Sequence, residues 1–249
     1  PPTVIAAFRM ILAGLAVTPL CIGALRRLLR ERGLGGLLLL AAPGAVLGVH
    51  FQAWVIGLKM TSVASASFLI SINPVLFAVA ERLIYGKRAA WSTWVSLAMV
   101  LGGSYWLLSL RGGRLGQLGD LLCLLSGLLF VVYLLFSRRV SGDVPHLPYV
   151  QLVYLWGGLI TVPFALLGIG GAGRGPWGDL AQVRLADTAS LLALVALALF
   201  PTLVGHTSNN YGVRHLSPLT VSFFGLAEPI LGTLTAALFL GETPMAREF

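Results

Sequence analysis

The stretch that decides the fold is residues 62–85, which read SVASASFLISINPVLFAVAERLIY. About 20 apolar residues in a helix cross the roughly 30 Å hydrocarbon core of a bilayer. This stretch is that long, with Pro74 near its middle and Glu81 and Arg82 near its end. Backbone polar groups in lipid must be bonded within the segment, so we expect a membrane-spanning helix.

The rest of the chain has the same character. Its 249 residues are 57% hydrophobic and only 10% charged, whereas soluble chains carry about 25% charged residues. We predict eight transmembrane helices, at 3–24, 36–58, 62–85, 91–110, 118–138, 147–168, 188–211 and 217–240. The predicted fold class is therefore an all-α membrane protein.

The basic residues indicate an orientation. The net charge of +8 would suggest a nucleic-acid partner in a soluble chain. Here the basic residues gather between the spans, and we expect no nucleic-acid partner. The first, third, fifth and seventh connections hold ten lysines and arginines, against six on the other side. The positive-inside rule then places 25–34 and 138–146 in the cytoplasm and both ends of the chain outside.

The third predicted span is repeated in the eighth at a constant shift of 155 residues. Ser62 aligns with Ser217, Ser67-Phe68 with Ser222-Phe223, Asn73-Pro74 with Glu228-Pro229, and Gly86 with Gly241. The shift equals five helices, an odd number, so the two copies run oppositely through the membrane, as in the inverted repeats of many transporters. We expect eight helices of a complete ten, in two inverted five-helix repeats. The first repeat, 1–110, lacks its first helix, and the second, 118–249, lacks its last.

Both copies resemble the signatures of a known family. Residues 57–67, GLKMTSVASAS, with Ile72-Asn73-Pro74-Val75, resemble the first-repeat signature of the EamA-type transporters of the drug/metabolite transporter superfamily. Residues 216–218 and 227–230, with Leu240-Gly241-Glu242, are similar to the second-repeat signature, whereas the first repeat has Tyr85-Gly86-Lys87 where the family has Leu-Gly-Glu. Arg9 resembles an arginine in the family's second helix. The resemblance implies ten helices, two five-helix repeats and export of small metabolites such as amino acids.

Glu228 is an acidic residue at the centre of a predicted span. Charged groups at this depth are costly and often functional. Pro229 follows it, and a proline inside a helix kinks the helix and frees the carbonyl four residues earlier, here that of Gly225. The Glu228 carboxyl could bind a cation, a substrate amine or a proton, or it could be a protonated group that orders the kinked helix.

Two further candidates lie in the second and third spans. Asn73, with the second predicted kink at Pro74, could contact substrate or could hydrogen-bond a neighbouring helix. His50 and Trp54 are four residues apart and share a helix face. They could line a cavity that suits an amino-acid-like or aromatic substrate, or they could be ordinary packing residues.

The seventh span ends in six polar-capable residues, HTSNNY at 206–211. Such a run cannot face lipid on all sides. It lines a water-filled path, or it reaches the headgroup level. His206 and Asn210 share a face by their spacing of four, and we name His206, Asn209, Asn210 and Tyr211 as candidate pathway residues. Arg9, in the outer half of the first span, could pair with an anionic group or could extend outward to the interface.

These patterns predict a secondary transporter that exports a small metabolite, such as an amino acid, across a bacterial inner membrane by alternating access. The alternative is a membrane-embedded enzyme or a lipid-handling protein without transport activity. The sequence has no phosphate-binding loop and no metal-ligand spacing, so we expect no cofactor, no metal and no enzymatic activity. The expected partners are a small-molecule substrate and the lipid bilayer, and no feature of the sequence indicates an oligomeric state.

Overall fold

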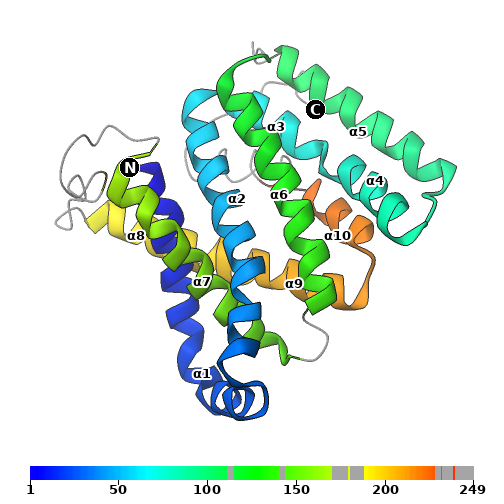
Figure 1. The fold of residues 1–249 in the computed structure, drawn as a ribbon. Coiled ribbons are helices and arrows are strands. Elements are labelled where there is room, and N and C mark those ends of the chain that lie inside the picture. The colour runs from blue at the N-terminus through cyan, green and yellow to red at the C-terminus, as the bar shows by residue number, and fades with distance from the viewer. Residues whose placement is uncertain are drawn as a thin grey trace.

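The computed structural model describes residues 1–110, 115–140, 144–169, 179, 188–227, 231 and 238. Across these residues the chain is helical, with no strand, which confirms the predicted all-α class (Figure 1). The helices are α1 (Pro2–Leu39), α2 (Ala41–Met60), α3 (Val63–Ser71), α4 (Asn73–Tyr85), α5 (Trp91–Leu110), α6 (Leu118–Val140), α7 (His146–Leu167), α8 (Thr188–Leu197), the π-helix η3 (Ala198–His206), α9 (Thr207–His215) and α10 (Pro218–Gly225).

Six helical segments of the described chain are long and apolar enough to cross a membrane. They are Pro2–Met60, Ala64–Tyr85, Trp91–Leu110, Leu118–Val140, His146–Leu167 and Thr188–His215. The first segment covers the predicted first and second spans, and part of the predicted eighth span lies outside the described residues. The chain is a multi-pass membrane protein. The count of eight spans and the ten-helix repeat stay predictions.

The first helix continues past the predicted end of its span at residue 24. Residues 25–32 contain leucine and arginine, which are good helix formers, so α1 remains helical through its arginines. At Gly33 the backbone leaves helical geometry, with a φ of 63° that glycine adopts at no steric cost. Figure 1 shows α1 descending from the N-terminus and α2 returning beside it. The pair can therefore cross a membrane twice.

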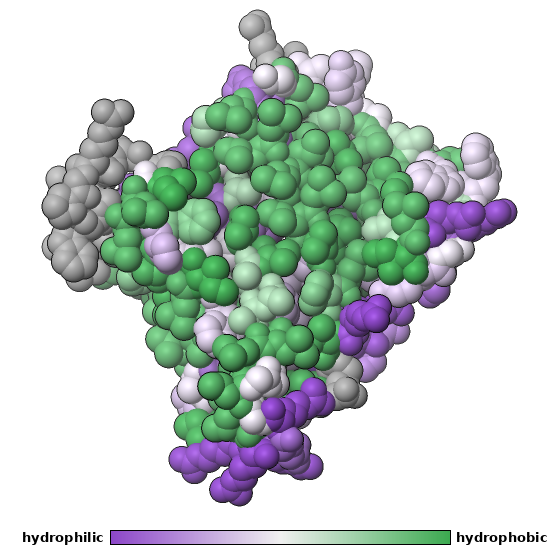
Figure 2. All heavy atoms as spheres, in the orientation of Figure 1, coloured by the Kyte–Doolittle hydropathy of each residue, from purple (hydrophilic) through white to green (hydrophobic). Residues whose placement is uncertain are grey.

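The surface of the molecule is that of a protein in lipid. Large apolar side chains point outward along the helices, including Leu20, Leu83 and Trp91, whose exposed fractions are 76%, 79% and 80%. Figure 2 shows hydrophobic side chains over much of the visible face and hydrophilic ones at its lower end, where α1 gives way to α2, and along its right edge. An apolar surface this extensive is stable only when covered, here by the bilayer.

Small residues bring α1, α2 and α7 into close contact. A Cβ atom added to Gly48 would lie 2.7 Å from the carbonyl oxygen of Gly157, and one added to Gly157 would lie 2.7 Å from the carbonyl oxygen of Gly44. A Cβ on Gly158 would lie 2.5 Å from Ile11. Membrane helices associate through such close backbone approaches, because lipid gives apolar side chains no reason to leave it. These glycines therefore let the backbones of the three helices approach closely.

The starts of α3 and α10 have the same local structure. Ser62 accepts a hydrogen bond from the Ser65 backbone N–H at 3.0 Å, and Ser217 accepts one from the Thr220 N–H at 3.0 Å. The φ and ψ angles are −76° and 151° at Ser62, and −69° and 145° at Ser217. A serine at this position satisfies an N–H that the helix itself leaves unbonded. The two serines are the residues that the 155-residue shift aligns.

Glu81 joins α4 to α10. Its buried carboxylate accepts a hydrogen bond at 3.0 Å from the backbone N–H of Leu219, in the first turn of α10. The neighbouring Arg82 is exposed and donates to the carbonyl oxygen of Gly86. A carboxylate at a helix N-terminus is favoured both by the free N–H groups and by the helix dipole. Glu81 therefore fixes the angle at which α10 starts.

The basic end of α1 gives a test of orientation. Arg26, Arg27, Arg30 and Arg32 are all exposed, and the two cysteines of this chain, Cys21 and Cys123, are buried. We expect an Arg30→Cys variant of the full-length protein to react with a membrane-impermeant maleimide only after the cytoplasmic side is opened. The reason is the excess of basic residues on that side. Labelling of intact cells at this position would contradict the predicted orientation.

Candidate functional site

A proline shapes the part of the seventh span that faces the bundle interior. Pro201 has no N–H, so the carbonyl of Leu197 lacks its usual helical partner. The backbone widens into the π-helix η3, and the Thr202 hydroxyl donates to the Leu197 carbonyl oxygen at 2.9 Å. Turns of this kind are rare and occur frequently at functional sites. The wide turn places Thr202 in the interior, where it is fully buried.

Arg9 of α1 meets Thr202 in that interior. The Arg9 Nε donates to the Thr202 hydroxyl oxygen at 2.7 Å, and its guanidinium carbon lies 4.1 Å from the ring centre of Phe51 of α2. The side chain is only 6% exposed, so it does not extend outward to the interface. Tyr154 of α7 donates to the Thr202 carbonyl oxygen at 3.0 Å. Four helical segments therefore meet around one buried cation.

The two histidines named from the sequence come together beside Arg9. The ring centres of His50 and His206 lie 5.9 Å apart, and His206 also packs edge-on against Phe51 at 4.7 Å and Phe130 at 5.6 Å. The His50 Nδ1 lies 2.8 Å from the carbonyl oxygen of Ser126 and 2.9 Å from its hydroxyl. His50 is thus anchored to α6.

Four polar residues follow one another at intervals of four along η3 and α9, and we call them the polar stripe: Thr202, His206, Asn210 and Arg214. Asn210 is buried and donates to the Tyr133 hydroxyl at 2.5 Å and to the His206 carbonyl oxygen at 2.8 Å. Arg214 donates to the Val144 carbonyl oxygen at 3.0 Å and lies 5.5 Å from the ring centre of Tyr149. The polar stripe therefore follows one face that packs on α6 and α7.

Several buried atoms of the polar stripe have no hydrogen-bond partner in the described ranges. They are the His206 Nδ1, the Asn210 Oδ1, and the Nε and Nη2 of Arg214. Buried polar groups are almost always bonded, so each exception asks for a reason. A row of such atoms inside one bundle is what a path for a polar molecule requires.

The other residues named from the sequence lie away from the polar stripe. Trp54 packs against a small cluster around Ala66, Leu69 and Cys123. Asn73 begins α4 after the helix is interrupted at Ile72, next to Pro74, and its Oδ1 lies 2.5 Å from where a Cβ on Gly127 would be.

Four candidates remain, of which the structure describes Tyr211 and Asn209. Tyr211 is 56% exposed, and its ring packs between His146 and His215. Asn209 is partly buried. Glu228 and Pro229 lie outside the described residues.

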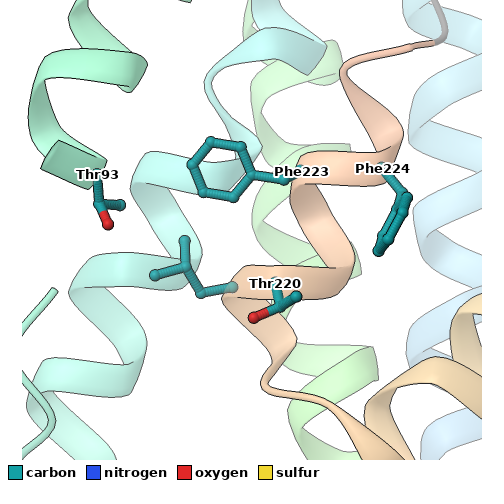
Figure 3. Close-up of a pocket in the computed structure, with 5 residues that line it drawn as sticks. Thr93, Thr220, Phe223 and Phe224 are labelled. Atoms are coloured by element: carbon teal, nitrogen blue, oxygen red, sulfur yellow. The ribbon is translucent and has the colours of Figure 1, made fainter. Parts of the chain in front are cut away.

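A cavity of about 360 Å³ lies elsewhere, between α5 and α10. It is lined by Thr93, Leu219, Thr220, Phe223 and Phe224. Figure 3 shows Thr93 across the gap from Phe223, with Phe224 pointing to the other side of α10. None of these side chains is charged and none belongs to the polar stripe. We therefore place the candidate site at the polar stripe, where buried polar groups converge from separate helices.

Comparison with known proteins decides the family. The sequence model of the EamA-like transporter family matches residues 1–109 and 117–249, nearly the whole chain. The chain belongs to the EamA-like transporter family. The chain is 25% identical over 191 residues to the uncharacterized transporter YdfC of Bacillus subtilis (strain 168), which covers 76% of this chain and 58% of that protein. The crystal structure of another protein is also similar, with a TM-score of 0.72 and 19% sequence identity. The match covers 100% of this chain and 82% of the chain in the crystal structure, which shows a shared fold.

In this EamA-like chain, sequence reasoning missed several residues that contact Arg9 or belong to or contact the polar stripe. Thr202, Tyr133, Tyr154 and Phe51 sit in apolar spans and were not singled out. One signal was available, because Pro201 falls within the predicted seventh span and is followed at once by a threonine. In the part of the chain that the structure describes, no group of three or more His, Cys, Asp and Glu side chains could hold a metal ion.

Proposed function

We propose that this EamA-like chain carries the transport path of a secondary transporter. It exports a small metabolite, such as an amino acid, across a bacterial inner membrane by alternating access. In this proposal, eight of ten helices are present, arranged as two inverted five-helix repeats. The chain spans 58% of the length of its curated relative, so the activity of the whole protein belongs to the proposal.

The observation that carries the proposal is the polar stripe. Its side chains come from the predicted second repeat, and it meets Arg9, His50 and Phe51 from the predicted first repeat. Transporters of this kind bind cargo between their two repeats, near the middle of the bilayer. Polar groups retained there, at a cost in lipid, mark a pathway.

Two irregular helical segments, one of which carries part of the polar stripe, support alternating access. The third span is interrupted at Ile72, between α3 and α4, and the seventh is widened over Ala198–His206. The backbone at Ile72 stays helical but uses i to i+3 hydrogen bonds, and a short stretch of such bonds inside a helix often marks a hinge, whereas π-helical turns occur frequently at functional sites. Interrupted helices can also bend at these points without breaking the bonds of a regular helix. We place the moving parts of the cycle at these two segments.

The test is an export assay in cells that lack the chromosomal gene. The cells are loaded with a mixture of dipeptides, which are hydrolysed to free amino acids, and small metabolites in the medium are followed by mass spectrometry. We expect the full-length protein to speed the appearance of at least one metabolite, and a protonophore to slow it. Equal release with and without the protein, for every metabolite followed, would reject the proposal.

A further inference from the structure

Arg9 is a buried cation with a donor edge left over. Its side chain is 6% exposed, and its Nε is bonded to the Thr202 hydroxyl at 2.7 Å. Across the described residues, neither Nη group forms a hydrogen bond or ion pair, and the ion pair found there joins Arg27 to Glu31. An isolated buried charge is costly unless it is paired and hydrogen-bonded. The described chain therefore supplies no counter-charge to Arg9, and the Nη edge of its guanidinium is free to bind an anion.

The buried carboxyls of the described chain are engaged elsewhere. Glu81 accepts from the Leu219 N–H, Asp120 from Thr61 and from the Gln117 N–H, and Asp179 from Thr3. Each of these bonds lies at or near an end of a helix. None of these three carboxyls is within ion-pair distance of Arg9.

The surroundings of Arg9 fix its orientation. Thr202 is itself held by the Leu197 carbonyl, and the guanidinium plane lies against the Phe51 ring at 4.1 Å. With Nε occupied, the free edge of the guanidinium is the one formed by Nη1 and Nη2. Two parallel N–H groups of this kind match the two oxygens of a carboxylate. A preorganised fork also loses little side-chain entropy when it binds.

We propose that Arg9 binds a carboxylate group of the transported molecule. The inference rests on the proposed transport function and names the chemical class of the cargo. A carboxylate carries one negative charge and is neutralised by the single guanidinium, whereas a phosphate monoester carries about −1.5 to −2 at neutral pH and would leave buried negative charge. The rings of Phe51 and His206, in contact with each other beside the guanidinium, supply an aromatic wall for the rest of the molecule.

The experiment compares carboxylates with their neutral amides on the purified full-length protein. The probes are acetate, benzoate, 3-phenylpropionate and L-phenylalanine, each beside its primary amide, and the readout is the shift in melting temperature with concentration. We expect at least one carboxylate to stabilise the protein saturably while its amide does not. Arg9→Gln is expected to weaken the binding of that carboxylate at least about tenfold, because removing one partner of a buried charge pair has a large effect on affinity.

Two variants keep the experiment decisive if Arg9→Gln does not fold. Arg9→Lys keeps the positive charge but loses the two parallel N–H groups, and it should weaken binding of the same carboxylate severalfold. Thr202→Val removes the hydrogen-bond partner of the Arg9 Nε, and it should weaken carboxylate binding without removing the charge of Arg9. Arg26→Gln, an exposed arginine on the same helix, is the matched control and should respond like the unchanged protein.

Three outcomes would overturn the proposal. One is stabilisation by none of the carboxylates, and another is equal stabilisation by the amides. The third is an Arg9→Gln defect that is repaired by adding Glu228→Gln, with no carboxylate effect, since Arg9 would then serve to pair with Glu228. Carboxylate binding without export of any metabolite would refute the transport function and keep the binding site.

Discussion

Replacing Gly48 with leucine is expected to prevent stable folding. A Cβ at this position would lie 2.7 Å from the Gly157 carbonyl oxygen and 2.7 Å from Thr161. The Gly157 carbonyl oxygen is a backbone atom and cannot move away by a rotamer change, so α2 and α7 must separate. Overpacking typically costs about 1–3 kcal/mol and occasionally more. Leucine adds three further carbons beyond the Cβ. We therefore expect the loss of stability to lie within this range for Gly48→Ala and at its upper end or above for Gly48→Leu.

The measurement is the abundance and melting temperature of the full-length variant in membranes and in detergent. Differences of a few kcal/mol lower abundance severalfold, because cells remove partly unfolded protein. Gly102→Leu is the matched control: Gly102 is also helical, and no atom lies within 4 Å of its added Cβ. A Gly48→Leu protein as abundant and as stable as the Gly102→Leu protein would show that the α2–α7 contact does not hold the fold together.

Replacing Asn210 with leucine is expected to slow export strongly while leaving the protein in the membrane. The leucine has nearly the same volume but cannot donate to the Tyr133 hydroxyl or to the His206 carbonyl. It also removes the Oδ1, which is buried with no hydrogen-bond partner among the described residues and which we propose contacts the cargo. A buried polar group that loses its partner costs about 1–3 kcal/mol. Since about 1.4 kcal/mol is tenfold in rate, a cost of this size corresponds to a roughly five- to 150-fold fall in export.

Asn209→Leu is the control for this prediction. It is the same substitution one residue earlier, off the face that carries His206 and Asn210. Export by both variants is measured at matched abundance with the dipeptide-loaded cells described above. If Asn209→Leu lowers export as much as Asn210→Leu, or if Asn210→Leu exports normally, the polar stripe is not the transport path.

The sequence predicted more of the fold than of the candidate site. The spans 62–85, 91–110, 118–138 and 147–168 were predicted nearly to the residue, because apolar length in lipid leaves a helix as the stable choice. Helix α1 continues beyond the predicted first span, and composition does not show whether Arg26–Arg32 continue a helix or form a loop. His50 and His206 were named from their positions in the spans, but their approach to 5.9 Å was not foreseen.

The sequence by itself determined the all-helical membrane class and the EamA-type resemblance, because both follow from local properties: apolar length, proline positions and short motifs. The tertiary structure decided which polar groups meet. Arg9 and Thr202 are separated by 193 positions, and their 2.7 Å bond depends on the packing of α1 against the widened turn at Pro201. The residue pattern within one helix does not predict a contact between two helices. A site built between helices exists only once small residues such as Gly48 and Gly157 have let the helices close on one another.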